Sequence, residues 1–315
     1  MTDGRAKAAA SYNGDGHLSL FGCLAYLALN RLHNSAPYAR LDPGLSIADF
    51  DAKGPALLAD LPGLPSPSRA MCDLLWMRLP WDAIEREVGP LRILDLGCGS
   101  GRYGTSLQTW TGGRVARYVG VDRDAHPEWT RLAAEYPYLE FRRGDVQMIG
   151  QLIPSETNII ISQSTLEHVS DDVSVFEQTH AYARRYERPM LHIHLVPSQE
   201  CLWTYLWHGY RQYTPRTLSA RTRLFADSAR LLVRLGGAAS NRLHFRFITW
   251  PLLIRRRADR RSASPLEYLA ELQRAVDCDM KQPQPSPAFY AVLVHSHARA
   301  ALFDNGPWRV RTRGR

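Results

Sequence analysis

The clearest chemical signal in the sequence is a glycine-rich turn at residues 93–102, with the sequence ILDLGCGSGR. Gly97, Gly99 and Gly101 stand at alternate positions, after an apolar segment and before a helical one. Glycines at such a turn let a ligand approach the backbone where a side chain would block it. A dinucleotide fingerprint needs glycine where this chain has Arg102, and a glycine turn alone indicates only a nucleotide-type ligand.

Three acidic residues narrow the choice of ligand. Asp95 precedes the first glycine by two positions, where a carboxylate would repel a pyrophosphate but pair with an ammonium group. Asp122 ends the next predicted strand, where an acid can accept hydrogen bonds from both hydroxyls of a ribose. Asp145, in a Gly-Asp-Val segment, is placed to accept from the amino group of an adenine. S-adenosylmethionine, which has these three parts and no phosphate, fits the set.

Residues from about 91 to 200 resemble the class I S-adenosylmethionine-dependent methyltransferase family, with its DxGxGxG loop, acidic second strand end and Gly-Asp pair. The segment Ser164-Thr-Leu-Glu-His168-Val resembles the "LEH" segment of the subgroup that acts on small molecules, lipids and sugars. The resemblance implies a doubly wound, mostly parallel seven-stranded sheet whose final strand is antiparallel. It also implies a cofactor site made of Asp95, Gly97, Gly99, Gly101, Asp122, Asp145 and Val146, with Ser164 near the sulfur of the cofactor.

Methyl transfer from a sulfonium is an in-line displacement, so the protein mainly supplies alignment and a dry site. A hydroxyl acceptor is a poor nucleophile and benefits from a general base. Bases should lie at the ends of the fourth and fifth predicted strands, because ligands bind at the carboxyl ends of strands in open α/β sheets. The candidates are His168, Glu167 and His194, and for each histidine a structural role remains the alternative.

The elements that position these residues alternate between strands and helices, which favours a parallel sheet covered on both faces. We predict strands at 91–96, 117–121, 139–142, 158–162 and 189–196, with helices around 103–109, 127–135 and 172–185. Pro80 should divide residues 68–88 into two helices. Further along, the pattern predicts helices at 217–235 and 264–277 and strands at 244–250 and 288–295, the last being our candidate for the antiparallel strand.

Three regions are predicted along the chain. Residues 1–68 form an N-terminal extension, with an apolar helix at 18–29 and a connector rich in Pro and Gly. Residues 69–300 form the methyltransferase domain, with an aromatic lid at 199–215 and a basic insertion at 242–262, and residues 301–315 are a basic tail. Thr214 and Pro215 should cap and open a helix after the lid.

The positive charge of the chain is concentrated in its last third. The net charge is +8, and residues 201–315 carry 20 basic and 7 acidic residues. This region could contact an anionic membrane surface, a phosphorylated carrier or RNA, or it could simply be a solvated face. No apolar stretch is long enough to span a membrane, and we expect a cytoplasmic protein, with peripheral attachment to a membrane as an option. Five dispersed cysteines argue against disulfides and a structural zinc site, and no metal is expected.

We therefore predict a methyltransferase that acts on a small molecule, a sugar or a lipid-linked glycan, most simply by O-methylation. A nucleic acid methyltransferase is the first alternative. It is disfavoured because residues 162–165, Ser-Gln-Ser-Thr, replace the Asn/Asp-Pro-Pro-aromatic segment of amino-methylating enzymes, and because the chain has no Pro-Cys pair. A scaffold that binds the cofactor without turnover is the second alternative, and the intact set of three acids weighs against it.

Overall fold

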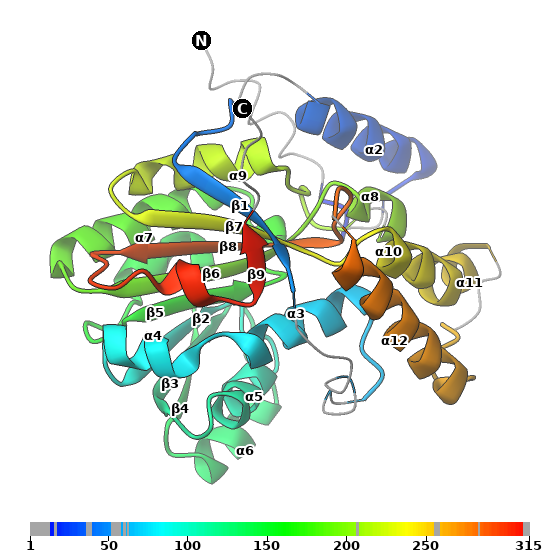
Figure 1. Ribbon diagram of the computed structural model, residues 1–315. Helices are drawn as coiled ribbons and strands as arrows, with labels where there is room; N and C mark the ends of the chain where they lie inside the picture. Colours follow the sequence, from blue (N-terminus) through cyan, green and yellow to red (C-terminus); the bar gives the residue numbers. More distant parts are fainter. Residues whose placement is uncertain are drawn as a thin grey trace.

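The structure is a computed structural model (Figure 1). It describes residues 13–15, 18–35, 40–51, 58, 61, 63–205, 208–254, 259–282 and 284–310. Its centre is a sheet in the order β4-β3-β2-β5-β6-β8-β7-β1-β9. The strands are β1 (Leu45–Phe50), β2 (Leu91–Leu96), β3 (Val115–Asp122), β4 (Leu139–Arg143), β5 (Ile159–Gln163), β6 (Met190–Pro197), β7 (Ala229–Leu235), β8 (Phe289–Ser296) and β9 (Trp308–Val310).

The predicted strands of the cofactor half are all present. β2 pairs in parallel with β3 and β5, β3 with β4, and β5 with β6. β8 runs antiparallel between β6 and β7, as the resemblance implied for the last strand. The fold is therefore α/β and Rossmann-like, with a mostly parallel sheet.

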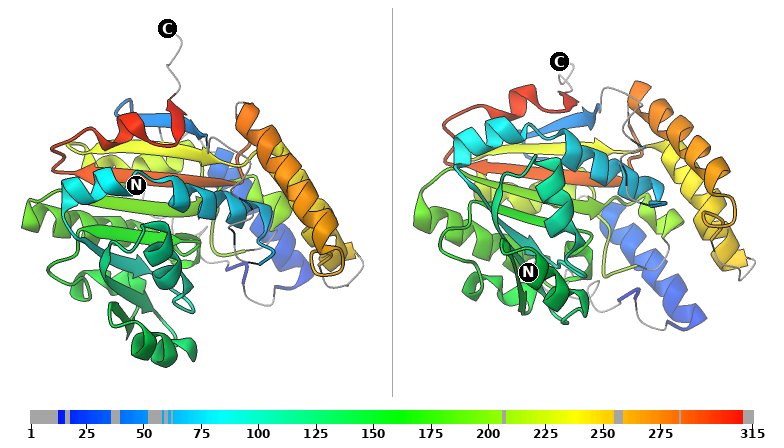
Figure 2. Two further views of the ribbon diagram at one scale, coloured as in Figure 1. Left: turned by 60° about the horizontal axis from the view of Figure 1, so that its bottom comes forward. Right: turned by 90° about the horizontal axis from the view of Figure 1, so that it is seen from below.

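Helices cover both faces of the sheet (Figures 1 and 2). One buried cluster joins Trp76 and Leu107 to Ile93, and the other joins Phe176 and Leu218 to Leu94. Ile93 and Leu94 are neighbours in β2 and face opposite ways, as in any strand buried on both sides. The covering helices are α3 (Pro67–Arg78), α4 (Trp81–Val88), α5 (Arg102–Trp110), α6 (Glu128–Glu135), α7 (Asp172–Tyr186) and α9 (Pro215–Thr222). Pro80 separates α3 from α4, and Thr214 caps α9 with a capping box.

A second group of helices gathers at the end of the sheet where β6 and β7 finish (Figure 2). It contains α2 (Leu20–Ser35), α8 (Cys201–Thr204), α10 (Ala238–His244), α11 (Trp250–Ile254) and α12 (Pro265–Lys281). Between α10 and α11 lies a π-helical turn, η5 (Phe245–Thr249). Short helical turns η2 (Val146–Gln151), η3 (Leu166–His168), η4 (Arg223–Phe225) and η6 (Leu302–Asn305) complete the described elements.

Two predictions of element type are wrong. Residues 217–235 are not one helix, because α9 ends at Thr222 and β7 follows from Ala229. β7 is paired on both sides, with β8 and β1, so its run of apolar residues is a central strand rather than a helix face. Residues 244–250 are helical rather than a strand, because Leu243 and Phe247, four residues apart, are both buried.

The sheet also has two strands beyond the seven expected. β1 lies in the segment predicted to be an irregular connector and pairs in parallel with β7. β9 lies in the predicted tail and pairs antiparallel with β1. The buried ion pair between Arg234 of β7 and Asp49 of β1, with N and O atoms 2.8 Å apart, joins this addition to the central strands. Among the described residues, no helix is both long and apolar enough to cross a membrane.

Candidate active site

The glycine-rich turn joins the end of β2 to the start of α5. The Gly97 N–H donates to the Val121 carbonyl over 2.7 Å, which holds the turn against β3. Gly97 has φ of +73°, and a Cβ there would lie 2.2 Å from the Thr165 side chain. A Cβ on Gly99, with φ of +53°, would meet nothing within 4 Å. The turn is therefore packed tightly underneath and open above, as a backbone cradle for a ligand requires.

A cavity of about 510 Å³ lies above this turn. Of the eight predicted cofactor residues, it is lined by six: Gly97, Gly99, Asp122, Asp145, Val146 and Ser164. Asp122 accepts a hydrogen bond from the Gly99 N–H over 2.8 Å, and Asp145 accepts one from the Gln147 N–H over 2.8 Å. Two carboxylates thus face one cavity from the ends of β3 and β4, which fits a cationic, phosphate-free adenosyl ligand.

The other two predicted cofactor residues lie beneath the cavity. Asp95 is 2% exposed, and its carboxylate accepts a hydrogen bond from the Tyr118 hydroxyl. Burial, opposed by that hydrogen bond, raises the pKa of Asp95 to about 7. Gly101, with φ of +80°, precedes α5, and a Cβ there would lie 2.4 Å from the Phe141 ring. Contact of Asp95 with the cofactor's ammonium group stays a prediction.

Ser164 has a strained backbone at the edge of this cavity. Its φ is +51°, which non-glycine residues seldom adopt, and its N–H donates to the Leu195 carbonyl over 3.0 Å. Strain of this kind gathers at binding sites, where the surrounding structure holds it in place. Ser164 also lines a second, smaller cavity, so it lies between the two.

This second cavity has a volume of about 250 Å³, and its lining combines apolar surface, to which Cys72, Pro197 and Phe289 contribute, with several polar side chains. Ser164 and His168 line both cavities. Gln163 accepts a hydrogen bond from the Trp76 indole over 2.7 Å, and the Tyr205 hydroxyl is bonded to Ser68. The lining includes Ser66, Ser68, Arg69, Gln163, Tyr205 and His208. Serine, amide, phenol and imidazole groups around a small space suit a polar, hydroxylated molecule.

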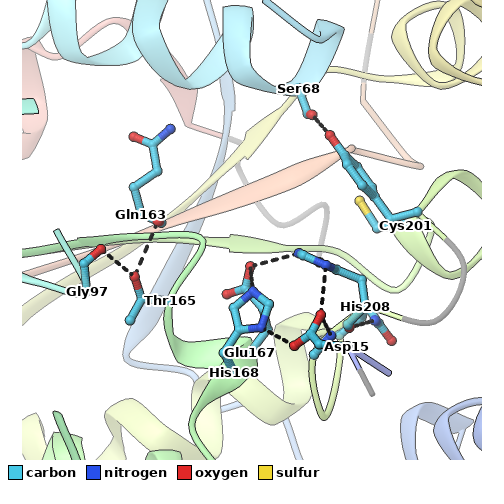
Figure 3. Close-up of polar contacts among 12 residues, drawn as sticks. Asp15, Ser68, Gly97, Gln163, Thr165, Glu167, His168, Cys201 and His208 are labelled. Carbon is cyan, nitrogen blue, oxygen red and sulfur yellow. Dashed lines mark hydrogen bonds and ion pairs between the residues drawn. The ribbon is translucent and has the colours of Figure 1, made fainter. Parts of the chain in front are cut away.

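Four ionisable side chains meet beside the two cavities (Figure 3). Nδ1 of His168 lies 2.6 Å from Asp15, and Nδ1 of His208 lies 3.3 Å from Asp15. On their other side, Nε2 of each histidine lies 3.9 Å from the Glu167 carboxylate. Glu167 is wholly buried, and neither of its oxygens has a hydrogen-bond partner.

The pKa values in this cluster are shifted by burial and by the neighbouring charges. Burial raises the pKa of Glu167, against the attraction of the two histidines. Burial alone would lower the pKa of His168, but the hydrogen bond to Asp15 and the charge of Glu167 raise it. Asp15 shows the opposite balance, because hydrogen bonds from His168, His208 and Gly209 outweigh burial and lower its pKa.

Some residues of the predicted aromatic lid line the two cavities. Tyr205 and His208 line the smaller cavity, and Tyr210 lines the larger one. Tyr213 is buried in the core, Trp203 is 56% exposed, and Trp207 lies outside the described residues. The Tyr210 N–H donates to the Glu167 carbonyl over 2.6 Å, so the loop after α8 is tied to η3.

The structure brings Glu167 and His168 together but not His194. His194 is 1% exposed, its Nδ1 is bonded to the Ser162 hydroxyl over 2.9 Å, and its ring packs on Phe176. Burial lowers its pKa to about 4, so it is a weak base in that position. Sequence reasoning missed Asp15 altogether and named His208 only as a member of the aromatic segment.

Comparison with known proteins identifies the domain. Residues 94–185 match the family model of a methyltransferase domain. No curated protein matches the chain. The chain therefore contains a methyltransferase domain at these residues.

Several solved structures are similar to this chain. The plantazolicin methyltransferase BamL, in complex with a triazolic desmethylPZN analog and SAH, is 13% identical over 73% of this chain and 85% of its own, with a TM-score of 0.46. An S-adenosylmethionine-dependent methyltransferase from Mesorhizobium loti is 17% identical over 68% and 95%, with a TM-score of 0.41. One from Archaeoglobus fulgidus is 14% identical over 68% and 90%, with a TM-score of 0.41.

Proposed function

We propose that this methyltransferase moves the methyl group of S-adenosylmethionine to a hydroxyl group of a small molecule, a sugar or the sugar end of a lipid-linked glycan. The observation that carries the proposal is the pair of adjoining cavities, which share Ser164 and His168 as lining residues. In this proposal the larger cavity holds the cofactor and the smaller one the acceptor.

The size and lining of the smaller cavity support a compact polar acceptor. About 250 Å³ suits one ring or a short polar group, and a larger molecule would have to leave its remainder outside. Ser66, Ser68 and Gln163 offer hydroxyl and amide groups that pair with the hydroxyls of a sugar-like ring. The ring of Tyr205 provides a flat apolar surface beside them.

The cofactor contacts in the proposal follow from the larger cavity. Asp122 would accept from the ribose hydroxyls, Asp145 and Val146 would border the adenine, and Gly97 and Gly99 would lie under the amino acid end. The sulfonium supplies the activated methyl group. Ser164 would lie at the sulfur end, because it is one of the two residues that line both cavities.

His168 and Glu167 are the residues that we propose activate the acceptor hydroxyl. His168 faces both cavities, and the Glu167 carboxylate lies behind its ring. An acceptor bound in the smaller cavity would place its oxygen between His168 and the methyl group. The protein then supplies alignment, exclusion of water and removal of the hydroxyl proton.

The experiment is methyl transfer from cofactor labelled at the methyl carbon into a fractionated extract of small molecules and glycans. We expect label on an oxygen of a low-molecular-weight hydroxylated compound or glycan, and a loss of about 100-fold in turnover for His168→Ala. His126→Ala, an exposed histidine at the start of α6, serves as the matched control and should keep full turnover. Label on nitrogen or in RNA would contradict the proposal.

We also propose that the C-terminal third contacts an anionic partner, either a membrane surface or a phosphorylated carrier. Support comes from exposed apolar side chains at α11, where Trp250, Leu252 and Leu253 are 42%, 51% and 41% exposed. The arginine run 255–257 that follows them lies outside the described residues. Exposed apolar groups beside arginines are typical of a membrane-contacting surface.

A further inference from the structure

In the cluster of Asp15, Glu167, His168 and His208, the hydrogen bonds do not satisfy every polar atom, because the Glu167 carboxylate has no hydrogen-bond partner. Two imidazole rings, with centroids 4.6 Å apart, lie between two carboxylates. Both Nδ1 atoms face Asp15, and both Nε2 atoms face Glu167 (Figure 3). Three segments far apart in the sequence supply these groups: residues 13–15, η3 and the loop after α8.

Glu167 determines where the imidazole protons should lie. A wholly buried carboxylate without a hydrogen-bond partner carries a large desolvation cost, so it needs N–H donors aimed at it. The nearest candidates are the two Nε2 atoms, at 3.9 Å. With a proton on each Nε2, each neutral ring has its lone pair on Nδ1.

Those lone pairs then point at another carboxylate. Nδ1 of His168 and Nδ1 of His208 lie 2.6 and 3.3 Å from Asp15. The alternative leaves the protons on Nδ1, where both rings donate to Asp15, and Glu167 must then carry a proton of its own to face the two Nε2 lone pairs. A divalent ion in place of the Nδ1 protons satisfies the two nitrogens and Asp15 at once and leaves Glu167 ionised between two N–H donors.

The spacing of the donor atoms fits such an ion. One ligand atom each from Asp15, His168 and His208 lie within 4.8 Å of one another. Metal bonds to imidazole nitrogen and carboxylate oxygen are about 2.0–2.2 Å long, so modest side-chain movements bring the three donors into range. Glu167 would accept from both Nε2–H groups, in the carboxylate–histidine–metal arrangement that fixes the orientation of ligating histidines.

We propose that Asp15, His168 and His208 bind one divalent transition-metal ion, with Glu167 holding the two imidazoles from behind. Two imidazoles and one carboxylate favour ions such as Zn²⁺, Fe²⁺ or Mn²⁺, whereas Mg²⁺ and Ca²⁺ prefer oxygen donors throughout. This proposal departs from the expectation of no metal drawn from the sequence, in which these ligands could not be grouped because Asp15 is 153 positions from His168.

The position of the site suggests its use, and this step rests on the proposed O-methylation. Asp15 and His168 line the cofactor cavity, and His168 and His208 line the acceptor cavity. An ion held there would lower the pKa of an acceptor hydroxyl in the smaller cavity, and the proton would leave to solvent at the partly exposed side of the cluster. The acceptor oxygen would form the new C–O bond as the S–C bond breaks, with S-adenosylhomocysteine as the leaving group. His168 would then act on the acceptor through the ion that it binds, rather than by taking the proton directly.

The first test measures metal binding without any acceptor. The full chain is stripped with a chelator and titrated with Zn²⁺ by calorimetry, and with Co²⁺ by its visible absorption. We expect one ion per chain, and at least a 100-fold weaker binding for His208→Ala and Asp15→Asn. Glu167→Gln should weaken binding by about 10- to 100-fold, as loss of a supporting carboxylate does. His126→Ala, an exposed histidine outside the cluster, should bind as the wild type does.

Binding of S-adenosylhomocysteine by each variant shows that it is folded. No stoichiometric binding of Zn²⁺, Co²⁺ or Mn²⁺ by the stripped wild type, or equal binding by His208→Ala, would overturn the metal site. Metal binding without methyl transfer to any oxygen would leave the site intact and remove the proposed function. Full O-methyl transfer by the stripped protein in chelator would overturn the proposed use of the ion in the reaction and leave the proposed function intact.

Discussion

Among single residues, Asp122 makes the contact that connects the glycine turn to the wall of the larger cavity, where we propose that the ribose binds. Its carboxylate ends β3, lines the cavity and accepts the Gly99 N–H. We expect Asp122→Ala to weaken binding of S-adenosylhomocysteine by about 10- to 100-fold, because charge-assisted hydrogen bonds contribute about 1.5–3 kcal/mol. Calorimetric titration measures this change.

The control for that prediction is Asp124→Ala, which removes a carboxylate that is 67% exposed and pairs only locally with Arg123. We expect it to bind the ligand as the wild type does. Unchanged affinity in Asp122→Ala would mean that the ribose does not lie at the end of β3, and the assignment of the larger cavity to the cofactor would then be wrong.

Asp95 should make the stability of the protein depend on pH. Its pKa is raised from 3.8 to about 7 in the folded state, chiefly by burial. Between these values the unfolded chain has released a proton that the folded protein keeps. The free energy of unfolding therefore falls as pH rises from about 4 to about 7, by on the order of 4 kcal/mol at 1.36 kcal/mol per pKa unit.

The measurement is urea denaturation at a series of pH values. Asp95→Asn cannot titrate but still offers an oxygen to the Tyr118 hydroxyl, so it should flatten this part of the pH profile relative to the wild type. Parallel profiles for the two proteins would show that Asp95 is already ionised in the folded state at low pH.

Among the elements, helix α2 positions the loop that carries His208. The hydroxyl of Tyr26 donates to the His208 carbonyl over 2.8 Å and accepts from Gln212 over 2.9 Å. Tyr26 is fully buried. We expect Tyr26→Ala to lower the free energy of unfolding by about 3 kcal/mol or more, because it removes a buried aromatic side chain together with its hydrogen bonds.

Phe21 provides the matched control on the same helix, since it is 78% exposed. Phe21→Ala should change stability by less than about 0.5 kcal/mol. Denaturant unfolding compares the two variants, and limited proteolysis should cut Tyr26→Ala faster within residues 18–35. Equal stability of the two would show that α2 is not fixed to the loop through Tyr26.

At the scale of the whole molecule, positive charge is concentrated in the C-terminal third, but several arginines near the sheet form ion pairs with aspartates. Arg211 and Arg221 pair with Asp172, and Arg230 pairs with Asp42. These buried and half-buried pairs tie the C-terminal third to the rest of the chain and offer little to a distant anionic partner. Among the described residues, Arg246, Arg260 and Arg274 stay 45–69% exposed, and α11 adds exposed apolar side chains to the same third of the chain.

We therefore expect the full chain to sediment with vesicles that contain phosphatidylglycerol and not with vesicles of phosphatidylcholine alone. Salt should reduce this binding, because part of it is electrostatic. Replacing Leu252 and Leu253, both more than 40% exposed, by serine should reduce it further. Equal binding to both kinds of vesicle, or to neither, would contradict the proposed anionic membrane partner and leave a phosphorylated carrier as the alternative.

The strands and the glycine turn of residues 91–200 could be predicted from the sequence alone. The glycine turn and Asp95 belong to one continuous strand–turn–helix segment, and Asp122 and Asp145 each end or follow a strand with a clear apolar pattern. Parallel strands end at one edge of a sheet, so local pattern was enough to bring these acids together. The secondary structure of short apolar runs was harder to predict. The apolar patterns of β7 and η5 fit both a helix and a strand, and only the elements packed against them decide between the two.

The grouping of side chains around the two cavities could be seen only once the packing of distant segments was known. Asp15 contacts His168 and His208 because the N-terminal segment packs on the loop after α8, with the Gly14 N–H donating to the Gly209 carbonyl over 2.7 Å. Likewise, His194 and His168 carry the same side chain, but one lies in the core and the other at the cavities. Contacts between distant segments depend on how whole elements pack, and local periodicity carries no information about them.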